Sequence, residues 1–146
     1  MKKKYLIALC IISILFLGGV FRYALAPSPQ ICCNGLCFDL ELAQTDEERE
    51  QGLMQRNYLE GNKGMLFIFS DEGIYPFRMK NTLIGLDIIR LDSNFQIVDI
   101  QEAIPCREEP CSSYVPSFKA QYVLEINQGI STKNGIVSGT TCVLSQ

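Results

Sequence analysis

The cysteines restrict the fold more than any other feature, because six of the seven follow residue 30. An even number of cysteines is typical of a disulfide framework in a domain outside the cytoplasm. The Asn34-Gly35 pair is the strongest signal for a two-residue hairpin turn, and it places Cys32 opposite Cys37. At such a non-hydrogen-bonded position the Cα atoms lie about 4.5 Å apart, within reach of a disulfide. The sequence therefore predicts a bonded hairpin.

The four other cysteines can pair in several ways. Cys106 and Cys111 flank a short polar loop that a disulfide would close, which leaves Cys33 and Cys142 for each other by elimination. Six cysteines allow 15 full pairings. Because the spacings match no common zinc pattern, we expect no metal and no cofactor. The alternative is a thiol-redox or copper protein, in which free thiols bind Cu(I) together with thioethers from Met54, Met65 and Met79.

The N-terminus predicts a targeting segment. Three lysines precede an uncharged run of 17 residues from Tyr5 to Phe21. As a helix this run spans about 25 Å, slightly less than a ~30 Å hydrocarbon core. We expect residues 1–26 to be a signal peptide or membrane anchor, residues 27–31 a linker, and residues 32–146 an extracytoplasmic β domain. The domain is then held in the membrane by residues 5–21, or secreted if the leader is cleaved.

Charge and composition exclude several functions. Beyond residue 26 the chain holds nine cations against 16 acids. Because such a surface repels phosphate backbones, we expect no nucleic acid partner. The chain has no histidine, which excludes Ser-His and Cys-His catalytic pairs and every zinc site that contains histidine.

The domain alternates short strand patterns with turns. The acidic segment after Thr45 has the pattern of a capping box and predicts a short helix that ends at Gly52. Strands are predicted at residues 65–69, 86–92, 96–100, 120–127 and 136–144, with turns at 34–35 and 71–73 and one helical turn at 131–134. The pattern predicts a mainly β single domain, either a β-sandwich or a partly closed, jelly-roll-like barrel, with one or two short helices behind an N-terminal hydrophobic helix.

Asp87 breaks the apolar pattern of its strand, where it shares a face with Ile89 and Leu91. A half-buried carboxylate needs a cation or hydrogen-bond donors. Residues 80–82 could supply them across a tight bend, either as a structural ion pair or as part of a ligand pocket. The candidate binding cluster comprises the polar residues near this bend and two further charged positions: Arg56, Arg78, Lys80, Asn81, Thr82, Asp87 and Glu125.

Catalysis has little support in the sequence. Lys80 with Asp87 or Glu125 could in principle carry out the acid–base chemistry of a hydrolase. However, the chain has no Gly-x-Ser-x-Gly, no phosphate loop and no Gly-x-Gly-x-x-Gly. We therefore expect a module that binds a small ligand or an envelope protein, with the thiol or copper protein and the hydrolase as alternatives.

Five blocks occur in order: Gly52-Leu53-Met54 with Arg56, Gly64-Met65-Leu66-Phe67 with Phe69, Phe77 with Met79-Lys80-Asn81-Thr82, Leu86-Asp87 with Leu91-Asp92, and Tyr122-Val123-Leu124-Glu125 with Gly129. In residues and spacing they resemble the domain of unknown function 192 family over roughly residues 31–144. The resemblance implies a small, mainly β, often exported domain with a sandwich or jelly-roll-like barrel, and it implies no activity. This chain has Arg78 where the family usually has tryptophan, and Gly85 where it usually has proline, so its ligand surface differs there.

Overall fold

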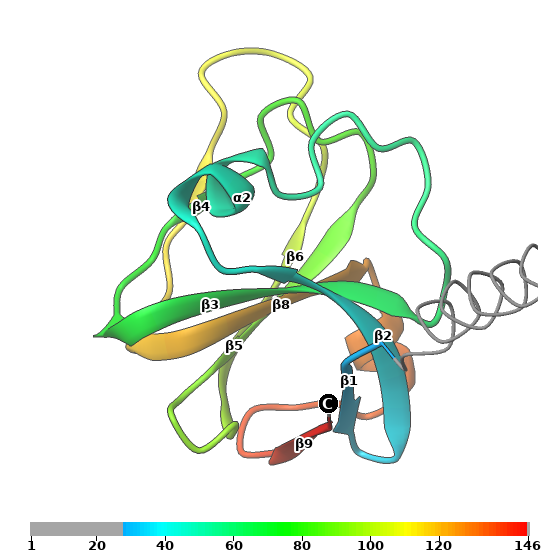
Figure 1. The fold of residues 1–146 in the computed structure, drawn as a ribbon. Coiled ribbons are helices and arrows are strands. Elements are labelled where there is room, and N and C mark those ends of the chain that lie inside the picture. The colour runs from blue at the N-terminus through cyan, green and yellow to red at the C-terminus, as the bar shows by residue number, and fades with distance from the viewer. Residues whose placement is uncertain (1–27, 146) are drawn as a thin grey trace, which may run out of the picture.

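The computed structural model describes residues 28–145, which form one seven-stranded sheet and one two-stranded sheet (Figure 1). The predicted leader over residues 1–26 lies outside the described residues. Within residues 28–145 no helix is long and apolar enough to cross a membrane. The strands and helices are β1 (Gln30–Cys33), β2 (Leu36–Ala43), α2 (Asp46–Gln51), β3 (Lys63–Gly73), β4 (Phe77–Arg78), β5 (Leu86–Leu91), β6 (Ile97–Ala103), β7 (Ser113–Tyr114), β8 (Ala120–Asn127), α3 (Ile130–Lys133) and β9 (Cys142–Ser145).

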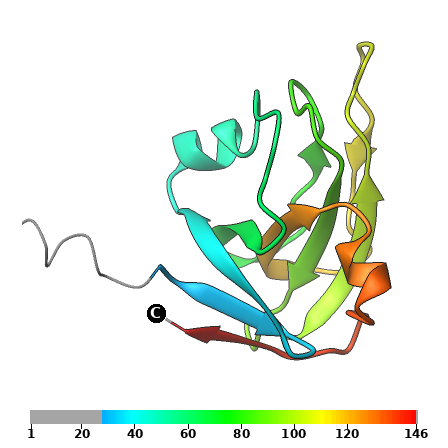
Figure 2. The same ribbon diagram turned by 90° about the vertical axis from the view of Figure 1, so that its right-hand side faces the viewer.

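The large sheet curls into a half-barrel with the strand order β6-β5-β8-β3-β2-β1-β9 (Figure 2). Its two edges approach each other at one end, where Gln96 bridges to Thr141 and the Ile97 N–H donates to the Thr140 carbonyl at 2.8 Å. The mainly β fold with few short helices is confirmed. The sheet is a single curled layer, as in a partly closed barrel, and does not form the two packed layers of a sandwich.

The β1–β2 hairpin turns at Asn34 and Gly35, whose φ angles of 49° and 81° are those of a type I′ turn. This turn sets Cys32 opposite Cys37 in the strand register. The cysteines are joined in the same three pairs that the sequence favours: Cys32–Cys37, Cys33–Cys142 and Cys106–Cys111. The second of these bonds ties β1 to β9, its neighbour in the sheet.

The parallel pairing of β2 with β3 positions the helix α2, which lines the candidate site described below. A parallel pair requires a crossover, and the connection from β2 to β3 supplies it through α2 (Figure 1). The helix begins with the expected capping box, because Thr45 accepts from the Glu48 N–H while the Glu48 carboxylate accepts from the Thr45 N–H. The helix ends at Gly52, whose φ of 45° favours glycine.

The sheet has two different faces. The inner face, which the curl encloses, carries mainly aliphatic side chains together with Phe38 and the Cys33–Cys142 sulfur atoms. The outer face lies under α2 and the two-stranded sheet, and it carries Met65, Phe67 and Val123 among others. Because successive side chains of a strand point to opposite faces, β8 places Leu124 and Ile126 inside and Val123 and Glu125 outside.

Several element bounds differ from those predicted. β3 continues through the predicted turn at 71–73, because its pairing with β8 shifts in register between Ile68 and Gly73 and then resumes. β9 begins only at Cys142, since Gly135 and Gly139 adopt positive φ angles before it. β1 begins at Gln30, inside the predicted linker.

Candidate functional site

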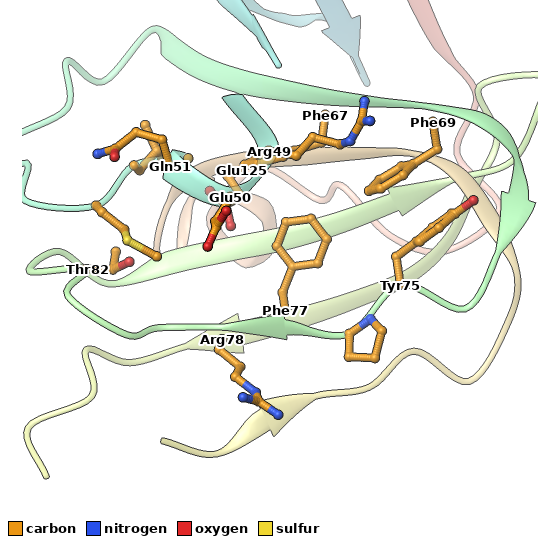
Figure 3. A pocket seen from close by; sticks show the side chains of 14 residues that line it. Arg49, Glu50, Gln51, Phe67, Phe69, Tyr75, Phe77, Arg78, Thr82 and Glu125 are labelled. Atoms are coloured by element: carbon orange, nitrogen blue, oxygen red, sulfur yellow. The ribbon is translucent and has the colours of Figure 1, made fainter. Parts of the chain in front are cut away.

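A cavity of about 530 Å³ opens on the outer face of the sheet (Figure 3). Its lining comes from α2 and the turn after it, from β3, from the β3–β4 connection with β4, and from one residue each of the β4–β5 connection and β8. Its volume lies in the usual range of small-molecule sites. The buried residues Leu53, Thr82 and Glu125 form the floor, and the exposed residues at the mouth include Glu50.

Four aromatic side chains form much of the wall. Phe67 and Phe69 lie two residues apart on β3, so the pleat points both rings to the outer face. Phe67 meets Phe77 edge to face with the ring centroids 4.9 Å apart, and Phe69 stacks on Tyr75 at 3.6 Å. The Tyr75 hydroxyl donates to the Asp71 carbonyl at 2.8 Å, which fixes this ring in place.

Glu125 is the unusual residue of the floor. It projects from the middle of β8, between Met65 on β3 and Ile88 on β5, and its exposed fraction is 5%. No group within residues 28–145 donates a hydrogen bond to its carboxyl oxygens, and only burial and the charge of Arg90 act on its ionisation. Burial raises the pKa of Glu125 to about 8, and Arg90 opposes this shift. At pH 7 the carboxyl group is therefore mostly protonated and can both donate and accept a hydrogen bond.

Arg90 is buried in β5 on the same face as Glu125. Its guanidinium group donates to the carboxylate of Asp99, its cross-strand partner on β6, at 3.0 Å, to the Gln101 side chain at 3.0 Å, and to the Tyr114 carbonyl at 2.8 Å. Its Nε has no hydrogen-bond partner within the described chain. Burial lowers the pKa of Arg90, but an arginine remains charged at physiological pH.

Neither of the two arginines that line the cavity pairs with Glu125. Arg49 donates to the Gln44 and Ile68 carbonyls at 2.6 and 2.7 Å, and pairs with Asp46 at 2.5 Å. The same guanidinium group lies 5.2 Å from the centroid of the Phe69 ring. The Arg78 side chain is exposed and extends away from the aromatic wall (Figure 3).

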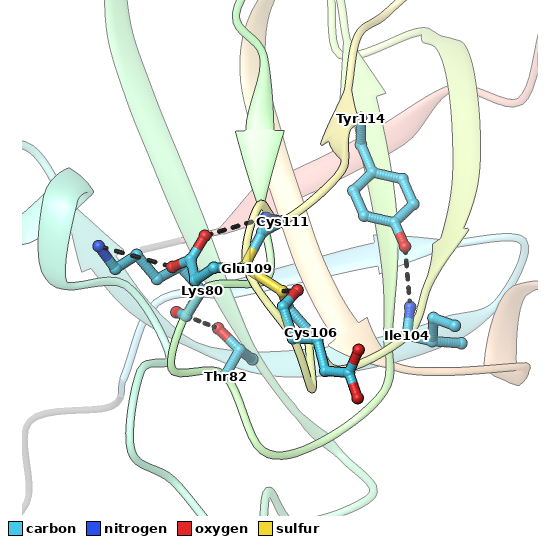
Figure 4. Close-up of a disulfide and its surroundings, with 8 residues drawn as sticks. Lys80, Thr82, Ile104, Cys106, Glu109, Cys111 and Tyr114 are labelled. Carbon is cyan, nitrogen blue, oxygen red and sulfur yellow. Dashed lines mark hydrogen bonds and ion pairs between the residues drawn. A yellow bond between two sulfur atoms is a disulfide. The ribbon is translucent and has the colours of Figure 1, made fainter.

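The structure brings three of the seven predicted site residues to this cavity, namely Arg78, Thr82 and Glu125. The Thr82 hydroxyl is directed toward the Lys80 carbonyl at 3.4 Å. Lys80 itself is exposed and lies 3.7 Å from Glu109, in the loop closed by the Cys106–Cys111 disulfide (Figure 4).

Two further predicted residues make structural contacts elsewhere. Arg56 forms a two-pronged ion pair with Glu41 on β2, with distances of 2.5 and 2.6 Å, and this pair lowers the pKa of Glu41. Asn81 adopts a positive φ of 55°, and its carbonyl accepts from the Gln55 N–H at 2.8 Å. Both contacts hold the loops that follow α2 and β4.

Asp87 faces the opposite side of the sheet from Glu125. It is fully buried, and its two oxygens accept from the Gly129 and Ser131 N–H groups, each at 2.8 Å. The expectation that residues 80–82 satisfy this carboxylate across a bend is wrong. The pleat of β5 turns Asp87 toward the inner face, where the backbone at the start of α3 supplies the donors.

Sequence reasoning missed the aromatic wall and the buried Arg90. Phe67 and Phe69 have strand spacing, but an apolar run at that spacing is equally typical of a filled core. The sequence does contain a signal for Arg90. Apart from Asp87, it is the one charged residue in the otherwise apolar strand β5. Within residues 28–145 no group of three His, Cys, Asp or Glu side chains could hold a metal ion, and the six cysteines are in disulfides.

Fold and site together define a class: a mainly β domain with a curled sheet and an aromatic cavity that contains a buried acid. The chain belongs to the DUF192 family, described as "Uncharacterized ACR", whose model matches residues 30–144. The resemblance seen in the sequence is thereby confirmed.

Two solved structures have a similar fold. A protein of unknown function from Novosphingobium aromaticivorans DSM 12444 is 31% identical with a TM-score of 0.72, over 78% of this chain and 83% of that chain. A Sinorhizobium meliloti 1021 protein, described as a candidate transcription regulator, is 28% identical with a TM-score of 0.72, over 82% of this chain and 96% of that chain. The comparison with curated proteins gives no match.

Proposed function

We propose that this domain binds a small ligand with an apolar body in the aromatic cavity, and that Glu125 holds the polar group of that ligand. One observation carries the proposal: Glu125, a residue that is 95% buried, lines a cavity of about 530 Å³, and its carboxyl group has no hydrogen-bond partner within the described chain. Buried polar groups in native proteins nearly always have partners. A ligand in the cavity would supply the missing one.

The lining supports a ligand of mixed character. The rings of Phe67, Phe69, Tyr75 and Phe77 offer apolar surface, and a few polar groups converge on the same space. Small-molecule sites typically combine a mostly apolar wall with few well-placed polar groups. The Glu125 carboxyl group lies in a recess of small-molecule size, which favours a small ligand over the broad surface of a protein partner.

An extracytoplasmic location is part of the proposal. It is supported by the lysine-flanked apolar run at residues 5–21 and by three disulfides in a domain of this size. The hydrolase alternative is less well supported, because Lys80 lies beside Glu109 and Asp87 lies on the other face of the sheet. The thiol or copper alternative requires free cysteines, whereas these six sulfur atoms are paired.

Saturation-transfer NMR on the oxidised, full-length protein tests the proposal with three probes of similar size that share a phenyl ring: 2-phenylethylamine, 2-phenylethanol and phenylacetate. We expect at least one probe to bind, and Met54→Trp, which fills the cavity from its wall, to abolish the signal. Tyr58→Trp is the matched control, because Tyr58 is 72% exposed and does not line the cavity. The absence of binding, or equal binding in both variants, would overturn the proposal.

A further inference from the structure

We propose that the ligand is an organic ammonium ion, whose charged nitrogen meets Glu125 at the floor of the cavity while its apolar body contacts the aromatic wall. This inference rests on the proposed function and specifies the chemical class of the ligand. Two features of the cavity support it, namely the aromatic wall and the distribution of charge around the floor.

The aromatic wall favours a cation. Aromatic rings carry negative charge on their faces and attract ammonium and guanidinium groups within about 6 Å of the ring centroid. The protein already uses this attraction once, because the Arg49 guanidinium lies 5.2 Å from the centroid of Phe69. Phe77 lies in the same wall, edge to face with Phe67, and offers a further ring to a ligand.

Charged and titratable groups from several elements surround Glu125. Arg90 comes from β5, Arg49 and Glu50 come from α2, and Tyr75 and Arg78 come from the β3–β4 connection and β4. On β3 the neighbours on this face are Met65 and Phe67, which do not titrate.

None of these cations contacts the Glu125 carboxyl group directly. Arg90 is hydrogen-bonded to Asp99, Arg49 is paired with Asp46, and Arg78 extends outward. A ligand ammonium would therefore be the first direct counter-ion of Glu125. Glu50 at the mouth adds a second acid on the path into the cavity.

Proton release should accompany binding. Because burial raises the pKa of Glu125 to about 8, about one in ten carboxyl groups is ionised at pH 7 in the unliganded protein. An ammonium ion binds the carboxylate form, so the Glu125 proton leaves to solvent and an ion pair forms. The apparent affinity should rise about tenfold per pH unit below pH 8 and level off above it.

Titration calorimetry at pH 6, 7 and 8 with the same three probes tests the inference. At pH 8 we expect 2-phenylethylamine to bind at least about tenfold more tightly than 2-phenylethanol, and phenylacetate to bind most weakly. Comparing phosphate with Tris buffer at pH 7 should reveal nearly one proton released per amine bound. This second measurement needs no variant and so does not depend on folding of a mutant.

Glu125→Gln should remove the preference for the amine and its pH dependence, while 2-phenylethanol still binds. Glu47→Gln is the matched control and should keep the preference, because Glu47 is exposed on the same helix and does not line the cavity. Equal binding of the amine and the alcohol, or a preference that survives Glu125→Gln, would overturn the inference and leave the proposed function standing. If no probe binds, both fail.

Discussion

Two buried carboxyl groups on opposite faces of one sheet have opposite surroundings. Asp87 on the inner face accepts hydrogen bonds from the Gly129 and Ser131 N–H groups. Glu125 on the outer face, one strand away on β8, receives none from the described residues, and burial raises its pKa to about 8. The first carboxylate holds a loop against the sheet. The second is kept at a cost in stability, as is common for functional groups.

The surroundings of the two faces differ in the same way. The inner face is closed by the curl of the sheet and tied by the Cys33–Cys142 disulfide. The outer face is covered only in part by α2 and the β4–β7 pair, which leaves a cavity of about 530 Å³. Both faces carry buried core residues, but only the outer one opens into a cavity, where we place the proposed ligand, and three predictions test this difference.

The largest effect should come from opening the inner face. Replacing both Cys33 and Cys142 by alanine removes a bond that closes a loop of 109 residues. In the chain-entropy model such a loop contributes about 5 kcal/mol, so we expect the free energy of unfolding in urea to fall by about that amount. The matched control replaces both Cys32 and Cys37 by alanine. Their disulfide joins cysteines only five residues apart, so its loss should lower the free energy of unfolding by about 2 kcal/mol. Equal losses would contradict this view of the inner face.

A smaller, pH-dependent effect should come from Glu125. Its pKa in the folded protein lies above the usual 4.5, so the unfolded chain loses this proton first as the pH rises. Stability should therefore fall between about pH 4.5 and pH 8 and then level off. The free energy of unfolding of Glu125→Gln should therefore rise relative to that of the wild type, by up to about 4 kcal/mol across this pH range. Urea unfolding of both proteins at pH 5, 6, 7 and 8 measures this difference in the free energy of unfolding. A difference that does not change with pH would contradict the raised pKa of Glu125.

The smallest effect, of opposite sign, should come from Asp87. Asp87→Asn removes the charge that accepts from two backbone N–H groups, so we expect a loss of about 2 kcal/mol in the free energy of unfolding. Asp71→Asn, at an exposed position, is the control and should change stability by less than about 0.5 kcal/mol. If Asp87→Asn changed the free energy of unfolding as little as this control, Asp87 would not stabilise the fold, and the contrast with Glu125 would fail.

Local chemistry made parts of the fold predictable from the sequence. The hairpin follows from Asn34-Gly35, because only residues that tolerate positive φ at both positions form that turn. The capping box at Thr45 and the alternation of apolar and polar residues in β8, which only Val123 interrupts, are also local patterns. These features involve residues close in sequence, so their geometry needs no knowledge of the rest of the chain.

The site was less predictable because its contacts are distant in sequence. The donors to Asp87 lie 42 and 44 residues away, so nothing near the residue reveals them. The cavity depends on the parallel β2–β3 pairing, which carries α2 across the outer face, and no local pattern specifies that pairing. Glu125 is a candidate from the sequence, whereas Phe67 and Phe69 in the same cavity have the strand spacing of ordinary core residues.

The Cys33–Cys142 disulfide also bears on proteolysis. It joins strands near the two ends of the described chain, so almost the whole domain lies within one covalent ring. Residues 107–110 between β6 and β7 are exposed, and they lie inside the smaller ring that the Cys106–Cys111 disulfide closes. A protease that cuts there would release no fragment, because the Cys33–Cys142 and Cys106–Cys111 disulfides and the hydrogen bonds of the sheet would hold the two pieces together. In an environment rich in proteases, a single cleavage would then leave the cavity intact.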